Sequence, residues 1–263
     1  MQPGIVTMNL LVRALYQNKK ILDLYKNPML YSVGFLYNYG VSCILIIALM
    51  LYNLHTHNHT ANSNILEMVN RYPYEDIDMP YFSTGIHPWH IDMDKLEEYL
   101  SVIDERLAMD NCLALGECGL DKRIEIPMDI QQQVFEKQLL LAKKHQKPVI
   151  LHCVAAYQEV IETKKRMNIE VPMIIHGFSK NAQVSKQLLD NGFYLSFGKY
   201  LLRNPELAEV FACVPDDKFF LETDTIDEGL EQVYEKAAAA KNIDIEELKN
   251  IVSNNFKTVF TNG

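Results

Sequence analysis

Short apolar runs that end at a histidine or a carboxylate recur along this chain. The first run, Leu51–His57, carries two imidazoles, His55 and His57, at its end. Because side chains alternate between the two faces of a strand, these imidazoles point the same way on a strand, whereas positions i and i+2 of a helix diverge. The pair therefore indicates a strand and, if further ligands join it, a shared metal ion.

Later apolar runs end in the same kind of residue. Leu113–Glu117 ends in a carboxylate, Pro148–His152 and Val171–His176 end in histidines, and Lys218–Glu222 is followed by Asp224. With the first pair, the residues at these ends are His55, His57, Glu117, His152, His176 and Asp224.

The strand-like runs alternate with runs of helical periodicity. We place strand centres at Leu51, Asn64, Tyr81, Leu113, Val149, Met173, Phe193 and Phe219. Helical patterns are expected over 94–107, beginning at a capping Asp94, and over 129–145, 156–167, 182–191, 230–241 and 245–260. Near-continuous apolar strands separated by helices predict an α/β fold with a parallel sheet, and eight such units close into a TIM-like (β/α)8 barrel. An open doubly wound sheet is the alternative, but no G-x-G-x-x-G motif or P-loop follows any run.

In such a barrel the carboxyl ends of the strands converge, so the six donors would meet in one cup. Imidazole and carboxylate are ligands for Zn, Mn or other divalent ions such as Mg, and six donors are too many for one catalytic zinc that keeps a water. We therefore expect two ions, which together activate a water and clamp the oxygens of a displacement. Glu117 would bridge them, His55, His57 and Asp224 would hold one, and His152 with His176 would hold the other. Asp224 is also a candidate proton acceptor, which makes Glu117 and Asp224 the expected catalytic residues.

Three further residues are candidates for contact with substrate. His87 and His90, on either side of the dipeptide Pro88–Trp89, can line the cup, although His87–Pro88 can equally form a turn. Lys180 follows a strand end and can meet a phosphate, although a loop lysine is usually solvated.

Composition limits the partners and the compartment. A formal net charge of -9 and a pI near 5.4 argue against a broad basic groove for duplex DNA, but not against a phosphate ester held by metal ions. The five cysteines are odd in number and contain no C-x-x-C pair, which favours reduced thiols in a cytoplasmic protein.

The first fifty residues leave alternatives open. Residues 29–52 are apolar and long enough for a membrane helix, but a span there would run directly into the first strand with no linker. We expect residues 1–49 to be an extension, non-native or an apolar anchor, and residues 50–263 to form a single folded domain.

The sequence is similar to the TatD family of metal-dependent hydrolases. The motifs that carry the resemblance are Leu54-His-Thr-His57, Gly85-Ile-His-Pro88, Gly116-Glu-Cys-Gly-Leu-Asp121, Pro148-Val-Ile-Leu-His152, Ile175-His-Gly-Phe-Ser179, Leu221-Glu-Thr-Asp224 and Asn255-Phe256. The resemblance implies a distorted TIM barrel, a two-metal centre on the six residues above, and phosphodiester hydrolysis, typically of DNA. It implies DNA or a small phosphoester as substrate and no obligate protein partner.

The sequence departs from the family pattern at three places. Asn53 and Leu54 precede the first histidine pair where the family usually has Asp, Val154 stands where it often has Arg, and the loop after Asp224 lacks the usual Arg-x-Asn-x-Pro. These departures remove phosphate contacts, so a metal-dependent amidohydrolase or esterase that acts on a small amide, ester or lactone is kept as an alternative. A membrane-tethered binding protein without catalysis is the second alternative, motivated by residues 41–52.

Overall fold

The computed structural model describes residues 31–36, 44–225 and 228–261 of the chain, which divides into two compact units, Met1–Met50 and Leu51–Gly263. In the first unit, β1 (Tyr31–Leu36) pairs antiparallel with β2 (Ile44–Leu49). These strands occupy half of the stretch considered above for a membrane helix, whose residues 29–30 and 37–43 lie outside the described residues. Among the described helices, none combines the length and apolar character that a bilayer crossing requires.

The second unit is built on eight parallel strands that neighbour one another in chain order. They are β3 (Leu51–Thr56), β4 (Ile65–Arg71), β5 (Phe82–Thr84), β6 (Cys112–Asp121), β7 (Val149–Val154), β8 (Met173–Ile175), β9 (Phe193–Phe197) and β10 (Phe219–Leu221). Each contains or adjoins one of the eight expected strand centres, so the parallel α/β barrel predicted from the alternation of runs is confirmed.

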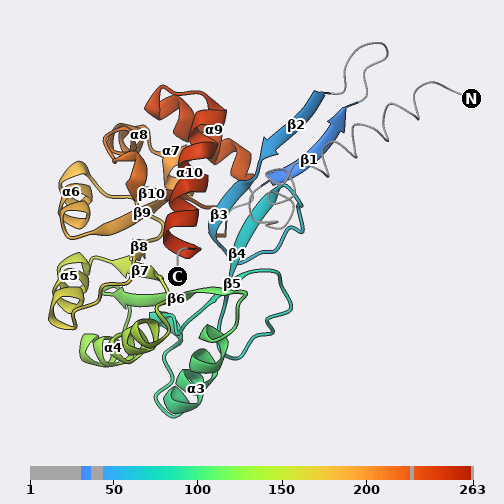
Figure 1. The fold of residues 1–263 in the computed structure, drawn as a ribbon. Helices are drawn as coiled ribbons and strands as arrows, with labels where there is room; N and C mark the ends of the chain where they lie inside the picture. The colour runs from blue at the N-terminus through green and yellow to red at the C-terminus, as the bar shows by residue number, and fades with distance from the viewer. Residues whose placement is uncertain (1–30, 37–43, 226–227, 262–263) are drawn as a thin grey trace, which may run out of the picture. The chain divides into compact units, whose positions relative to one another are not determined.

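Helices follow most strands and cover the outside of the sheet, as Figure 1 shows for α4, α5 and α6 beside β6 to β9. They are α3 (Leu96–Leu107), α4 (Met128–His145), α5 (Tyr157–Arg166), α6 (Ala182–Asp190), α7 (Lys199–Arg203), α8 (Pro205–Ala212), α9 (Leu230–Lys241) and α10 (Ile245–Phe260), with 3-10 turns η1 (Pro88–His90) and η2 (Asp216–Lys218). Their apolar stripes pack on the sheet, where Phe82, Phe135 and Phe193 are fully buried.

Two details of the helices differ from the sequence expectation. The expected cap Asp94 lies outside α3, whose N-cap is Lys95 with no capping hydrogen bond, because the Asp94 backbone N–H is held in a turn by the carboxylate of Asp92. The short helices α7 and α8 were not predicted, since five and eight residues are too few for periodicity to be distinguished from loop.

The barrel has a seam between its first and last strands. Strand β3 meets the β10 segment through one isolated parallel bridge, Thr56 to Asp224, instead of a continuous ladder. Before this bridge, the amide side chain of Asn53 accepts a hydrogen bond from the Thr223 N–H and donates to its hydroxyl. The Tyr234 hydroxyl of α9 accepts from the Tyr52 N–H at 2.9 Å and donates to the Tyr52 carbonyl at 3.1 Å. Side chains therefore replace ladder hydrogen bonds where the strands diverge.

Tyr234→Phe should destabilise the protein by about 1–3 kcal/mol, because it withdraws a partner from buried backbone groups of β3 without changing the packed ring. The free energy of unfolding in urea, compared with that of Tyr200→Phe on an exposed ring, measures the effect. Equal stability of the two variants would contradict the role given to this hydroxyl in the seam.

Candidate metal centre

The carboxylate of Glu117 lies at the middle of the site, on β6. Its backbone N–H donates to the Asn70 side chain of β4 at 2.6 Å. Gly119, two residues on, has a φ of 143° and lies so close to β7 that a Cβ would come 2.0 Å from the His152 carbonyl oxygen. Only glycine allows this approach, which brings the Glu117 and His152 side chains together.

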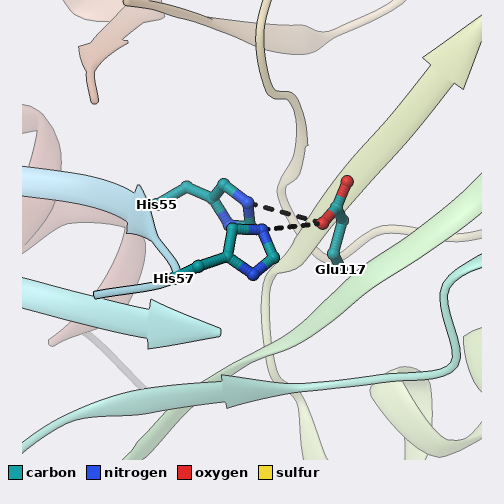
Figure 2. Close-up of side chains that lie close together, drawn as sticks. All are labelled: His55, His57 and Glu117. Carbon is teal, nitrogen blue, oxygen red and sulfur yellow. Dashed lines mark ion pairs between the residues drawn. The ribbon is translucent and has the colours of Figure 1, made fainter. Parts of the chain in front are cut away.

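One oxygen of Glu117 faces the histidine pair at the end of β3, where His55 lies in the strand and His57 follows it. Glu117 Oε2 lies 3.5 Å from His55 Nε2 and 3.6 Å from His57 Nε2. Figure 2 shows both rings turned toward this oxygen. The alternation along β3 thus places the two imidazoles together, as their spacing implies.

The other oxygen faces a second group of histidines. Glu117 Oε1 lies 2.7 Å from His176 Nε2, 2.9 Å from His152 Nδ1 and 3.2 Å from His87 Nε2. His152 belongs to β7 and His176 follows β8 directly. The carboxylate therefore stands between two sets of nitrogen donors.

Asp224 lies at the seam, beside the end of β3. Its Oδ1 lies 3.7 Å from His57 Nε2 and 4.0 Å from His55 Nε2, and Lys199 Nζ contacts its Oδ2 at 2.8 Å. Its backbone N–H donates to the His55 carbonyl, and its own carbonyl accepts from the His57 N–H. These two bonds fix Asp224 against the histidine pair.

The titration behaviour follows from burial and from these contacts. Burial by itself would raise the pKa of Glu117, but His176, His152 and His55 hold it well below its ordinary value. Burial would lower the pKa of His176, but Glu117 and Glu222 raise it well above the usual range. Without a metal ion, His176 and Glu117 thus form a buried ion pair, and a bound cation would displace the proton from His176.

Two carboxylates support the histidines from behind. Asp121 Oδ2 lies 3.3 Å from His152 Nε2 and accepts a hydrogen bond from the Trp89 indole at 2.8 Å. Glu222 Oε1 lies 3.4 Å from His176 Nδ1 and accepts from the Gly177 N–H at 2.7 Å. In each ring, the nitrogen facing away from Glu117 therefore has a carboxylate beside it, an arrangement that orients metal-ligating histidines.

The donor set fits metal ions. His55 is fully buried, yet neither of its ring nitrogens has a hydrogen-bond partner among the described residues, which is costly for an imidazole unless an ion occupies the space. Within the described ranges, three groups have donor atoms within 4.8 Å of one another: His55, His57 and Glu117; His55, His176 and Asp224; and His87, Glu117 and His152.

The donors open into a pocket of about 530 Å³. His90 and Lys180, both expected near substrate, line it, and His90 is exposed. His87 also lines it, but only 4% of its surface is exposed, and its Nδ1 accepts the Trp89 backbone N–H at 3.1 Å. His87 therefore contacts Glu117 and also forms the turn that the sequence offered as the alternative.

The structure adds residues that sequence reasoning gave no role. Tyr72 and Arg123 line the pocket, and burial together with the charge of Glu117 raises the pKa of Tyr72. No pattern marks these two, because both lie in irregular segments. Glu222 had a signal, since it precedes Asp224 by two residues, the same spacing as the histidine pair.

Comparison with known proteins places these features in a family. The family model described as TatD related DNase matches residues 31–261. The uncharacterized metal-dependent hydrolase YabD of Bacillus subtilis (strain 168) is 32% identical over 203 residues, which cover 71% of this chain and 79% of that protein. The 3'-5' ssDNA/RNA exonuclease TatD of a Rahnella species (strain Y9602) is 31% identical over 160 residues, 57% of this chain and 59% of that protein.

Solved structures share the fold. The TatD homologue YjjV of Escherichia coli K12 superposes with a TM-score of 0.69 at 20% identity, covering 81% of this chain and 98% of that chain. A TatD family hydrolase from Entamoeba histolytica gives a TM-score of 0.67 at 15% identity, with 80% and 98% covered. The barrel is thus common to proteins whose sequences have diverged widely.

His55→Ala should lower the affinity for divalent metal by more than about 100-fold, because it removes a proposed ligand. Loss of a residue that only hydrogen-bonds to a ligand lowers the affinity by about 100-fold at most. Elemental analysis after dialysis measures the retained metal, and His145→Ala is the matched control, because His145 pairs with Asp104 on the outside of the barrel. A His55→Ala protein that folds and keeps the wild-type metal content would remove His55 from the ligand set.

Proposed function

The chain belongs to the TatD related DNase family of metal-dependent hydrolases, and from this premise we propose that it cleaves phosphodiester bonds of DNA with two divalent ions. The ligands are those expected from the sequence: His55, His57, Glu117, His152, His176 and Asp224. The identity of the ions is Zn, Mn or Mg, whose preferred ligands include these donor types.

The position of Glu117 carries the proposal. Its two oxygens face different donor groups, Oε2 toward His55 and His57 and Oε1 toward His152 and His176. A carboxylate placed in this way can bridge two ions, which a carboxylate bound at one end cannot do. Asp224 Oδ1 completes the group that contains His55 and His57.

The protein side chains divide the work by their contacts. When bound, a pair of divalent ions lowers the pKa of a coordinated water and stabilises charge on the oxygens of a displacement. Burial by itself would raise the pKa of Asp224, but His176, His55 and Lys199 lower it, so Asp224 is ionised at neutral pH. Lys199 holds Oδ2 of this carboxylate, and the ionised Asp224 would accept a proton in the reaction.

A phosphodiester suits the charges that line the pocket. Arg123 and Lys180 line it, and neither forms an ion pair within the part of the chain that the structure describes. Either cation could contact a phosphate in place of the arginine that the family often has at the position of Val154. The name of the Rahnella relative, an exonuclease on single-stranded DNA and RNA, supports a nucleic acid with accessible ends as substrate.

We also propose that the hydrolase domain comprises residues 50–263 and acts in the cytoplasm. The unit Leu51–Gly263 contains all six proposed ligands and all eight parallel strands. The described thiols of Cys112, Cys118, Cys153 and Cys213 are free, which suits a reducing compartment.

Glu117→Gln should reduce cleavage of single-stranded DNA by about 1,000-fold or more, because it replaces the bridging charge by a neutral amide of the same shape. The rate is measured on an end-labelled oligonucleotide with metal added. Glu97→Gln on the exposed surface of α3 is the matched control and should cleave at the wild-type rate.

Two outcomes would replace the proposal. Cleavage that survives Glu117→Gln would remove Glu117 from the centre. Metal-dependent hydrolysis of a carboxyl ester, amide or lactone by a protein that leaves DNA intact would establish the alternative kept from the sequence.

A further inference from the structure

Trp89 is an exposed aromatic side chain with a fixed position. With 57% of its surface accessible, it is among the most exposed large apolar residues of the described chain, and it lines the pocket above the candidate metal centre. Its indole N–H donates to Asp121 Oδ2 at 2.8 Å, and its backbone N–H donates to His87 Nδ1 at 3.1 Å. An exposed residue whose ring and backbone are each held by a hydrogen bond loses little conformational entropy when a ligand packs on it.

The hydrogen bond that holds this ring also ties it to the metal centre. The oxygen that accepts the indole N–H, Asp121 Oδ2, lies 3.3 Å from His152 Nε2, and the rings of Trp89 and His152 are 5.7 Å apart. The far nitrogen of His152 faces Glu117. The distance between the ring and the reacting centre is thus set by one shared carboxylate.

Electrostatics alone gives this chain little affinity for a polyanion. The net charge is -9, and non-specific binding of nucleic acids depends mainly on lysines and arginines that neutralise phosphates. The pocket offers Arg123 and Lys180, while Lys199 is engaged by Asp224. A contact that does not depend on charge is needed, and base stacking on aromatic rings is the usual one for single strands.

We propose that Trp89 is a stacking platform for an unpaired nucleobase adjoining the scissile phosphate, so that the enzyme acts on unpaired strands or strand ends without strong sequence preference. This proposal rests on the phosphodiesterase function proposed above and assigns the subsite that selects its substrate. A paired base is stacked on both faces within the duplex and cannot lie on the indole until it is freed.

Because Trp89 is the sole tryptophan of the 263 residues, its fluorescence reports contact with a base directly. The probe is oligothymidylate with phosphorothioate linkages, which resist hydrolysis, added to the metal-loaded protein. Its matched control is a strand of equal length and charge in which abasic residues replace the thymidines. We expect saturable quenching by the oligothymidylate and little by the abasic strand, and weaker quenching by a blunt duplex.

Variants separate stacking from support of the site. Trp89→Ala should weaken binding of labelled oligothymidylate by about 10-fold, or about 1.4 kcal/mol, and binding of the abasic strand by less than about 2-fold. Trp89→Phe, which keeps a ring but loses the donor to Asp121, should bind oligothymidylate within about 3-fold of wild type. Leu140→Ala, at an exposed apolar residue of α4, should match wild type on both strands.

The outcomes distinguish failure of this inference from failure of the proposed function. A wild-type protein that cleaves no phosphodiester strand disproves the function. A protein that cleaves DNA but shows no quenching, or whose Trp89→Ala variant binds both strands as wild type does, overturns the stacking platform alone. If Trp89→Ala weakened binding of both strands equally and also lost bound metal, Trp89 would act only by supporting Asp121. That result would also overturn the stacking platform.

Discussion

A buried carboxylate among imidazoles is the interaction on which the rest of this structure depends. Only 3% of Glu117 is exposed, and an ionised group at that depth is costly unless neighbouring charges and donors compensate for it. Five histidines approach its two oxygens, and the Asn70 side chain holds its backbone. Gly119, two residues further along β6, lets β6 and β7 approach closely enough for the contact with His152 to form.

The site and the weakest part of the barrel coincide at the seam between β3 and β10. The bridge from Thr56 to Asp224 closes the ring of strands and also sets Asp224 beside the histidine pair. Asn53, which stands where the family usually has an acid, is used here to hold Thr223. Stability at this seam and placement of a proposed ligand therefore depend on the same backbone segments.

An acidic protein that acts on a polyanion must concentrate its attraction at one place. In the pocket, divalent ions, the side chains of Arg123 and Lys180 and the exposed indole of Trp89 would each contribute to substrate binding. The acidic surface elsewhere would disfavour extended binding along a duplex. The pocket is thus suited to short, accessible stretches of substrate, and its selectivity would come from contacts beside the metal centre.

The sequence by itself determined the strand order and the barrel class, because alternation along a strand and convergence of parallel strands are local rules. It also placed six donors on or directly after strands, but β6 and β7 continue past the expected ends at Glu117 and His152, to Asp121 and Val154. Only the tertiary structure decided that His87 contacts Glu117, that Glu222 stands behind His176, and that α7 and α8 form. It also decided that Gln131 and Gln138, two turns apart on α4, hold the backbone of Asp121 and of Ile86. These contacts join residues far apart in the chain, and their partners depend on how helices pack on the finished barrel, which no periodicity within one segment records.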